Sequence, residues 1–253
     1  MPMLMPTPAP LPGEQGAQLT GSERAEYVRQ MFARIVPRYD LFNTLSTFGQ
    51  DARWRRMVVD LSDLPPDGVA LDVATGTGAV AFALAERYPA AHIEAIDFTA
   101  PMIDAAQAKA RQAGGVASGV AFRVGDVLEL PYPDGHFDAV TVSFGVRNFS
   151  DIPRAFAEMR RVLKPGGRFV CLELTHARSP LVRLGFDIYF YRISPLLGTL
   201  LSGDRAAYSY LPASLTNFPN ADRLGQLLLA AGFSRVRYRL LNFGTIAIHT
   251  AER

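Results

Sequence analysis

The chain has 253 residues, of which 49% are hydrophobic and 20% are charged, as in an ordinary globular protein with one sizeable domain. Its 26 basic and 24 acidic residues leave a net charge of +2, so the composition predicts no nucleic-acid partner. The single cysteine, Cys171, excludes an internal disulfide and fits a reducing cytoplasm, and no apolar stretch has the length of a membrane span.

The first 21 residues predict a disordered tail. The stretch MPMLMPTPAPLPGEQG is apolar, is broken by five prolines and lacks the basic leader of a signal peptide. Residues 22–253 are expected to form one domain. Its first part, residues 22–66, predicts a helical cover, in which Ser22 caps a helix that starts at Glu23 and a second helix follows at 50–61.

After residue 69, short apolar strands alternate with helical stretches. Strands are expected at 69–74, 92–97, 120–124, 139–144 and 168–174, and helices at 80–87, 100–113 and 152–162. This order predicts a parallel sheet covered on both faces, with Cys171 as a buried strand residue. A last helix at 221–231 precedes two alternating runs joined by Asn242–Phe243–Gly244, which predict a hairpin. The fold class is therefore α/β, with five parallel strands and a terminal antiparallel pair.

Residues 179–212 do not follow this alternation. They are rich in Phe, Tyr, Leu and Ile with isolated arginines, and predict one or two helices inserted after the fifth strand. Three interpretations remain open from the residues alone: a packing insertion, an apolar cover over a substrate pocket, or a surface that contacts a membrane.

The run LDVATGTG, from Leu71 to Gly78, is the strongest functional signal. A strand that ends in Gly76-Thr77-Gly78 and opens a helix brings backbone close to a ligand. Asp97 ends the next strand, about twenty residues further on, where a carboxylate can bind ribose hydroxyls. Both a nicotinamide dinucleotide and S-adenosylmethionine are compatible with these features.

Three further features favour S-adenosylmethionine. Asp72 stands inside the first strand, Asp126 follows the third strand where it can accept from an adenine amino group, and LKPGGR precedes the fifth strand. Acidic side chains near the loop favour a sulfonium cation and repel a pyrophosphate. The alternative for Asp72 is an acid that orders the loop without contacting the ligand. The combination, over residues 69–174, resembles the seven-stranded, Rossmann-like class I methyltransferases.

Two longer runs resemble the ubiquinone/menaquinone biosynthesis C-methyltransferase family. The first is RIVPRYDLFNTLSTFGQDARWRR, residues 34–56, with Tyr39-Asp40 and Asn43 at its centre. The second covers residues 129–174, and SFGVRN at 143–148 is its most distinctive part. YLPASLTNFPNADRL and GTIAIH are similar too, so the resemblance spans nearly everything after residue 25.

This resemblance implies methyl transfer to a ring carbon of a polyprenylated quinol. The most direct reaction is demethylmenaquinol to menaquinol in menaquinone biosynthesis, and the alternative is a polyprenyl benzoquinol in ubiquinone biosynthesis. Combined with the loop, the resemblance places the S-adenosylmethionine contacts at nine residues: Asp72, Gly76, Thr77, Gly78, Asp97, Phe98, Asp126, Val127 and Ser143.

The expected catalytic residues are Arg147 and Asn148, at the end of the fourth strand, where open α/β sheets bind ligands. Arg147 would hold the phenolate of the quinol or order a water that takes its proton, and Asn148 would orient it. A salt bridge is the alternative for Arg147. Tyr39 and Asp40 would reach the site from the N-terminal cover, with helix-end packing as the alternative. The four histidines share no ligand spacing, so no metal site is predicted.

Other functions remain open: a small-molecule O- or N-methyltransferase of the same fold, a nicotinamide dehydrogenase, or a cofactor-binding protein without turnover. A polyprenylated acceptor is very hydrophobic. Residues 181–201, with Arg183 and Arg192, are therefore expected to form the isoprenoid channel or to rest on the membrane surface. We expect a cytoplasmic protein, peripheral to the inner face of the cell membrane, for which a homodimer is also open.

Overall fold

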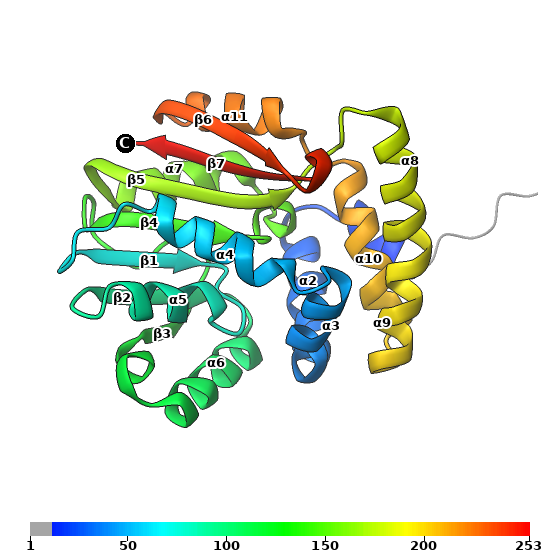
Figure 1. Cartoon of the computed structure of the whole chain (residues 1–253), viewed down its shortest axis with the longest axis horizontal. Coiled ribbons are helices and arrows are strands. Elements are labelled where there is room, and N and C mark those ends of the chain that lie inside the picture. The colour runs from blue at the N-terminus through cyan, green and yellow to red at the C-terminus, as the bar shows by residue number, and fades with distance from the viewer. Residues whose placement is uncertain (1–11) are drawn as a thin grey trace, which may run out of the picture.

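The structure is a computed structural model that describes residues 12–253. Its strands form one seven-stranded sheet in the order β3-β2-β1-β4-β5-β7-β6 (Figure 1). The strand bounds are β1 Val69–Val73, β2 His92–Asp97, β3 Ala121–Val124, β4 Phe137–Ser143, β5 Leu163–Leu174, β6 Ser234–Leu241 and β7 Ile246–Glu252. The predicted α/β class with a mostly parallel sheet and a terminal hairpin is confirmed.

The strand directions agree with the predicted parallel strands and terminal antiparallel pair. β1 to β5 pair in parallel, as predicted. β7 is antiparallel both to β5 and to β6, so β6 runs in the same direction as the first five strands. The hairpin therefore inserts its second strand between β5 and β6, and six strands share one direction.

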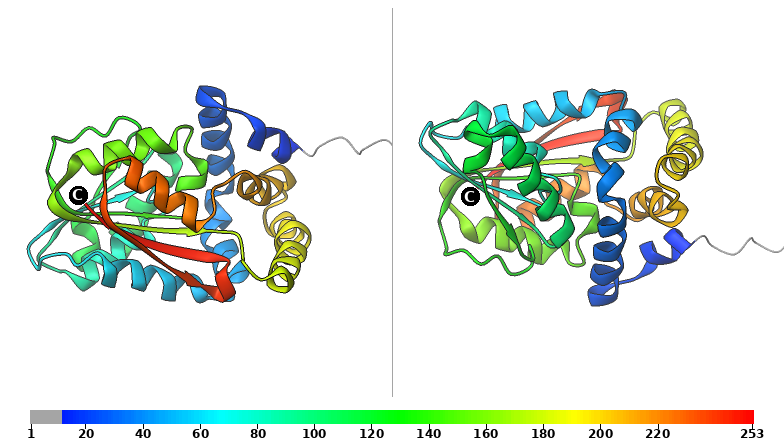
Figure 2. Two further views of the ribbon diagram at one scale, coloured as in Figure 1. Left: turned by 90° about the horizontal axis from the view of Figure 1, so that it is seen from above. Right: turned by 90° about the horizontal axis from the view of Figure 1, so that it is seen from below.

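Helices cover both faces of this sheet (Figure 2). α4 (Gln50–Leu61) and α5 (Ala79–Arg87) lie on one face, and α7 (Ile152–Val162) and α11 (Ala221–Ala230) on the other. α6 (Ala100–Ala113) packs beside β2 and β3. Because both faces are covered, the central strands are apolar on both sides.

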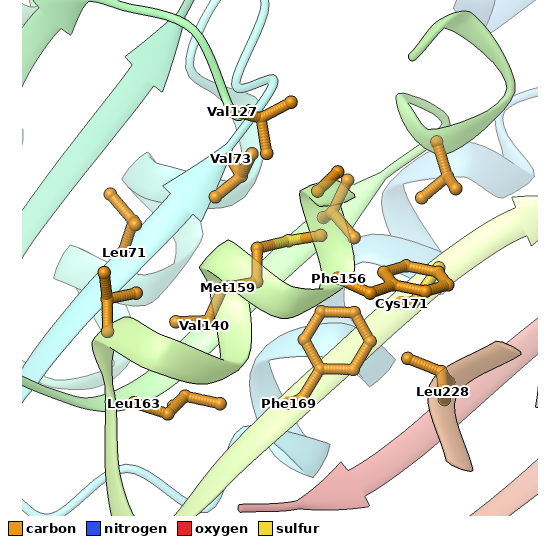
Figure 3. Close-up of a cluster of buried hydrophobic side chains, with 14 of the residues drawn as sticks. Leu71, Val73, Val127, Val140, Phe156, Met159, Leu163, Phe169, Cys171 and Leu228 are labelled. Carbon is orange, nitrogen blue, oxygen red and sulfur yellow. The ribbon is translucent and has the colours of Figure 1, made fainter. Parts of the chain in front are cut away.

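Each face has its own core. In the cluster of Figure 3, Leu71 and Val73 of β1 pack with Phe156 and Met159 of α7, and Cys171 is buried there as predicted. Ala70, whose side chain points to the opposite face, belongs to the other cluster, which includes residues of α4 and α5. Because successive side chains of β1 point to opposite faces of the sheet, this one strand packs against helices on both faces.

A third group of helices gathers at the end of the sheet where β1 and β5 finish (Figure 1). These end helices are α2 (Gly21–Ile35), α3 (Tyr39–Ser46), α8 (Pro180–Ile188), α9 (Ser194–Ser202) and α10 (Arg205–Thr216). A π-helical turn, η4 (Tyr189–Ile193), links α8 to α9. Buried residues of α2, α3 and α10 form a separate core, so the N-terminal cover and the insertion stabilise each other.

Two predictions for the N-terminal region need correction. Residues 12–18 form a helix, α1 (Pro12–Gln18), where a disordered tail was expected, and residues 1–11 lie outside the described chain. Gly13 lets α1 approach α10 closely, because a Cβ there would lie 2.2 Å from the carbonyl oxygen of Ala206. α2 begins at Gly21 with Thr20 as its N-cap and has no side-chain cap bond, so the Ser22 cap was wrong.

Other boundaries shift less. The insertion contains α8, η4, α9 and α10 and continues to Thr216, beyond the one or two helices expected. β5 begins at Leu163, before the predicted start at residue 168, and its pairing with β4 is irregular between Phe137 and Ala139. η1 (Val36–Arg38) separates α2 from α3 around Pro37, because proline interrupts a helix.

β1 carries a buried carboxylate, Asp72. One oxygen accepts a 2.7 Å hydrogen bond from the Thr75 hydroxyl, and the other accepts a 2.6 Å bond from the Thr141 hydroxyl on β4. Burial raises the pKa of Asp72 from 3.8 to about 6, although the bonds from Thr141 and Thr75 oppose the rise. Asp72 therefore holds the loop after β1 against β4.

This burial predicts a pH dependence of stability. Between pH 4 and pH 6 the folded chain keeps a proton on Asp72 that the unfolded chain has released, so the free energy of unfolding falls as the pH rises. Relative to Asp72→Asn, the wild type should lose up to about 3 kcal/mol between pH 4 and pH 7. Urea unfolding of both proteins at several pH values measures this, with the exposed Asp60→Asn as control. A difference that does not change with pH would contradict the assignment.

Candidate active site

Two neighbouring cavities lie between the end helices and the sheet. The loop cavity, of about 760 Å³, is lined by residues that follow β1, β2, β3 and β4. The helix cavity, of about 1300 Å³, is lined mainly by α2, α3, α4, α8 and η4. Phe32, Tyr39 and Phe144 line both. The strand order reverses between β1 and β4, the point at which open parallel sheets leave a crevice for ligands.

Six of the nine predicted cofactor residues line the loop cavity. They are Gly76, Asp97, Phe98, Asp126, Val127 and Ser143. Asp97 accepts backbone hydrogen bonds from Gly76 (2.8 Å) and Thr99 (2.9 Å), which fix its carboxylate at the end of β2. Burial raises the pKa of Asp97, and these two N–H donors oppose the rise. Six of the nine residues predicted to bind the cofactor therefore lie along one cavity, and their role in binding stays a prediction.

The backbone at this wall adopts conformations that most residues avoid. Gly76 has a φ of +56°, and Ala74 and Phe144, which end β1 and β4, have φ values of +51° and +57°. Such left-handed conformations in residues with side chains cost free energy and often occur at functional sites. The chain therefore turns sharply at both strands that border the crevice.

The other three predicted cofactor residues lie behind the wall. Asp72 orders the loop, as described above, which is the alternative that the sequence left open. Gly78 has a φ of +87° and lies against Phe122, which leaves no room for a Cβ. Thr77 is buried, and its hydroxyl donates a 2.6 Å hydrogen bond to Asp40. These three residues shape the loop, and their side chains do not line either cavity.

Asp40, expected to be catalytic, is not among the residues that line either cavity. One of its oxygens accepts from Thr77, and the other pairs with the ammonium of Lys109 on α6. Asp40 therefore joins α3 to the loop after β1 and to α6. This is the helix-end packing that the sequence left open, and it holds the end helices over the loop cavity.

Arg147 lines the helix cavity at η3 (Val146–Asn148), directly after β4. Its Nη1 donates to Glu173 at 2.5 Å and to the carbonyl oxygen of Phe144 at 2.9 Å. Its Nε is buried and has no hydrogen-bond partner among the described residues. Arg147 therefore forms the salt bridge that the sequence left open as an alternative, and it also lines the helix cavity.

Asn148 and Tyr39 line the loop cavity, and Tyr39 also lines the helix cavity. The Tyr210 hydroxyl of α10 donates to Oδ1 of Asn148 at 3.3 Å. Burial raises the pKa of Tyr39, and the positive charges of Arg55 and Arg147 oppose the rise. Tyr39 therefore stands between the cavities as a neutral phenol within reach of two guanidinium groups.

Sequence reasoning missed three charged residues of this site. Glu173 is fully buried at the end of β5, and Asp51 and Arg55 of α4 line the helix cavity. The sequence did contain a signal for Glu173. It is the single acid in the apolar run RFVCLEL, and a buried acid in a strand covered on both faces needs a charged or hydrogen-bonding partner. Within residues 12–253, no group of three or more His, Cys, Asp or Glu side chains is arranged to hold a metal ion.

The two cavities differ in chemistry. The loop cavity offers the Asp97 and Asp126 carboxylates, the Ser143 hydroxyl and apolar side chains, a set that suits a nucleoside. The helix cavity is lined by aromatic rings together with Arg55 and Arg147, a set that suits a large apolar molecule with an acidic hydroxyl. Because three residues line both cavities, the two binding spaces are adjacent.

The chain resembles a known protein family and several of its curated members. The model of the ubiE/COQ5 methyltransferase family matches residues 20–253. A demethylmenaquinone methyltransferase of Thermus thermophilus is 48% identical over 223 residues, which cover 88% of this chain and 100% of that protein. A demethylmenaquinone methyltransferase of Deinococcus radiodurans is 44% identical, covering 91% and 94%. A ubiquinone/menaquinone biosynthesis C-methyltransferase UbiE of Desulfotalea psychrophila is 42% identical, covering 88% of each.

Solved structures share the fold at lower identity. The [4+2]-cyclase SpnF superposes with a TM-score of 0.67 and 21% identity, covering 89% of this chain and 94% of its own. A SAM-dependent methyltransferase from Aquifex aeolicus has a TM-score of 0.56 and 19% identity, covering 78% and 88%. The fold is thus the Rossmann-like class I fold, which by itself does not determine the chemistry. By the family model and by these sequence relatives, the chain belongs to the ubiE/COQ5 methyltransferase family.

Proposed function

We propose that this chain transfers a methyl group from S-adenosylmethionine to a ring carbon of demethylmenaquinol, giving menaquinol. The observation that carries the proposal is Arg147, which lines an apolar cavity that shares a wall with the loop cavity. Relatives from Thermus thermophilus and Deinococcus radiodurans bear the name demethylmenaquinone methyltransferase, which supports a naphthoquinol acceptor. A benzoquinol acceptor is the competing outcome, supported by the UbiE name of more distant relatives.

The residues of the loop cavity fit S-adenosylmethionine. The Ser143 hydroxyl oxygen is buried at the wall without a hydrogen-bond partner among the described residues, so a polar ligand would satisfy it. Asp97 would hold the ribose hydroxyls, and Asp126 and Val127 would hold the adenine. When bound, S-adenosylmethionine supplies an electrophilic methyl group on a cationic sulfur.

The helix cavity would prepare the acceptor. A neutral ring carbon is a weak nucleophile, and loss of a phenolic proton moves electron density onto the ring. Arg147 would hold the phenolate oxygen with its free Nε–H, because Glu173 already fixes the Nη1 side of the guanidinium. Glu173 cancels the net charge of Arg147. Arg147 would therefore stabilise the phenolate by a directed N–H hydrogen bond and by the closeness of its guanidinium charge.

A panel of acceptors tests the reaction. With S-adenosylmethionine, the pure protein should methylate demethylmenaquinol on carbon at least tenfold faster, in kcat/KM, than a polyprenyl benzoquinol, and should leave a plain catechol unmethylated. Radioactive methyl incorporation and mass spectrometry of the products measure this. Preferred methylation of the benzoquinol would establish the ubiquinone alternative, and methylation of the catechol oxygen would overturn the proposal.

Arg147 can be tested without confusing catalysis with folding. Removing Arg147 alone leaves Glu173 buried without its partner, which destabilises a protein by about 3–5 kcal/mol. We therefore expect the double variant Arg147→Gln/Glu173→Gln to fold and to bind S-adenosylmethionine within threefold of wild type, but to turn over at least about 100-fold more slowly. Calorimetric titration and steady-state kinetics measure the two quantities. Loss of cofactor binding, or wild-type turnover, would contradict this role.

We further propose that α8, η4 and α9 bring the helix cavity to the inner face of the cell membrane. No helix within residues 12–253 is long and apolar enough to span a bilayer. Leu181 and Leu200 are 79% and 75% exposed, and Leu184, Ile188 and Leu196 are exposed on the same segment. Arg183 and Arg192 lie exposed beside them and suit anionic headgroups.

The exposed apolar side chains continue to the mouth of the cavity. Phe48, which lines the cavity and contacts the Tyr189 ring at a centroid distance of 6.0 Å, is 78% exposed. Phe243, next to the lining residue Asn242, is 87% exposed. Phe186 and Phe190, from the segment that bears the exposed leucines, also line the cavity. A polyprenyl tail would thus pass from lipid to the cavity along one apolar surface.

Flotation with anionic phosphatidylglycerol vesicles tests this contact. Replacing Leu181, Leu184, Leu196 and Leu200 by Ser should reduce the bound fraction at least fivefold, since each leucine contributes apolar area to the contact. The matched control replaces Val116, Val124 and Leu229, which are exposed elsewhere, by Ser. Equal flotation of both variants would contradict the proposal. The molar mass measured by light scattering without lipid would show whether a second copy of the chain covers this surface instead.

A further inference from the structure

The helix cavity contains a carboxylate that none of the roles above uses. Asp51, in the first turn of α4, is 5% exposed and lines the cavity next to Arg55 and Thr47. Its Oδ2 lies 3.1 Å from Nη1 of Arg55, and its Oδ1 accepts a 3.1 Å hydrogen bond from the Thr47 hydroxyl. Each oxygen therefore has one recorded partner and can accept another hydrogen bond.

Two sources of positive charge lie close to this carboxylate. Arg55 supplies a positive charge, and the first turn of α4 supplies the positive end of a helix dipole. A buried carboxylate with a single ion pair and a free lone pair on each oxygen is suited to take a proton from a ligand. An acid needed only for packing would not have to face a cavity.

Elimination leads to the same residue. Among the described residues that line the helix cavity, Asp51 is the single carboxylate, and no histidine lines it. Arg147 and Arg55 keep their protons at any ordinary pH and cannot act as bases. Burial raises the pKa of Tyr39, which keeps its hydroxyl neutral. Glu173 is fully buried and engaged with Arg147.

We propose that Asp51 is the catalytic base that accepts the phenolic proton of the acceptor. The O–H bond of the ring hydroxyl breaks, its electron pair stays on the phenolate oxygen, and the proton forms a new O–H bond on the Asp51 carboxylate. The proton then leaves to solvent through the cavity mouth. This inference rests on the proposed function, in which Arg147 holds the same phenolate.

The helix cavity also contains its own reporter of binding. Trp54 is the single tryptophan of the sequence, lines the cavity, and lies one helical turn from Asp51. Quenching of its fluorescence by 1-naphthol, a mimic of the acceptor ring, measures binding without S-adenosylmethionine and without turnover. Binding and proton transfer can therefore be separated.

The test compares Asp51→Asn and Asp51→Glu with the matched control Asp60→Asn, which is exposed on the same helix. In the full-length enzyme, Asp51→Asn should lower kcat at least about 100-fold, whereas naphthol binding and the melting temperature stay near wild type. Asp51→Glu should recover part of kcat. With a fluorinated naphthoquinol whose hydroxyl is already ionised, the deficit of Asp51→Asn should fall below tenfold.

Two results would overturn the assignment. An equal deficit with the ordinary and the fluorinated acceptor would mean that Asp51 does not take the proton. Naphthol binding that falls as much as kcat would mean that Asp51 only positions Arg55. The kinetic comparison uses the acceptor of the panel that the wild type methylates. If the wild type does not methylate demethylmenaquinol, the proposed function is refuted, whereas the role of Asp51 can still be tested with the other acceptor.

Discussion

The buried ion pair between Arg147 and Glu173 is the interaction on which the site depends. It joins the end of β5 to the turn after β4, where the two cavities meet. Arg24 of α2 donates a 2.7 Å hydrogen bond to the carbonyl oxygen of Arg147, so the end helices are tied to the same turn. Removing two charges from water is expensive, and such a pair is retained only with good geometry. Here both the side chain and the backbone N–H of Arg147 contact Glu173.

A second link sets the position of the end helices. Asp40 binds the Thr77 hydroxyl in the loop after β1 and the Lys109 ammonium on α6, so α3 cannot move independently of the loop cavity. Tyr39, the neighbouring residue, is thereby placed between the cavities. The sheet provides the wall for one ligand and the end helices enclose the other.

The sequence predictions were accurate where a feature depends on residues close together in the chain, and incomplete where it depends on contacts between distant segments. Strands and helices of the sheet layers were predicted nearly to their ends, because their apolar periodicity depends on neighbouring residues. The loop residues Asp97, Asp126 and Ser143 were placed on the correct wall, because parallel strands end at one edge. The terminal hairpin was predicted but its place in the sheet was not, because a hairpin signal does not say which of its strands pairs with β5.

The polar side chains that do not line a cavity could not be recognised from the sequence. Asp72, Thr77 and Asp40 are polar residues in or near motifs. Each forms a hydrogen bond with another polar side chain, either within the loop or far away in the chain. Glu173 and Arg147 are 26 residues apart, and Asp51 faces a cavity whose other walls come from α2, α8 and η4. By itself the sequence determined the fold class, the family and the edge of the sheet at which the loop cavity lies, because these depend on local patterns and strand order. Only the tertiary structure decided which carboxylates are bonded and which face a cavity, because that depends on distances between segments that no spacing along the chain specifies.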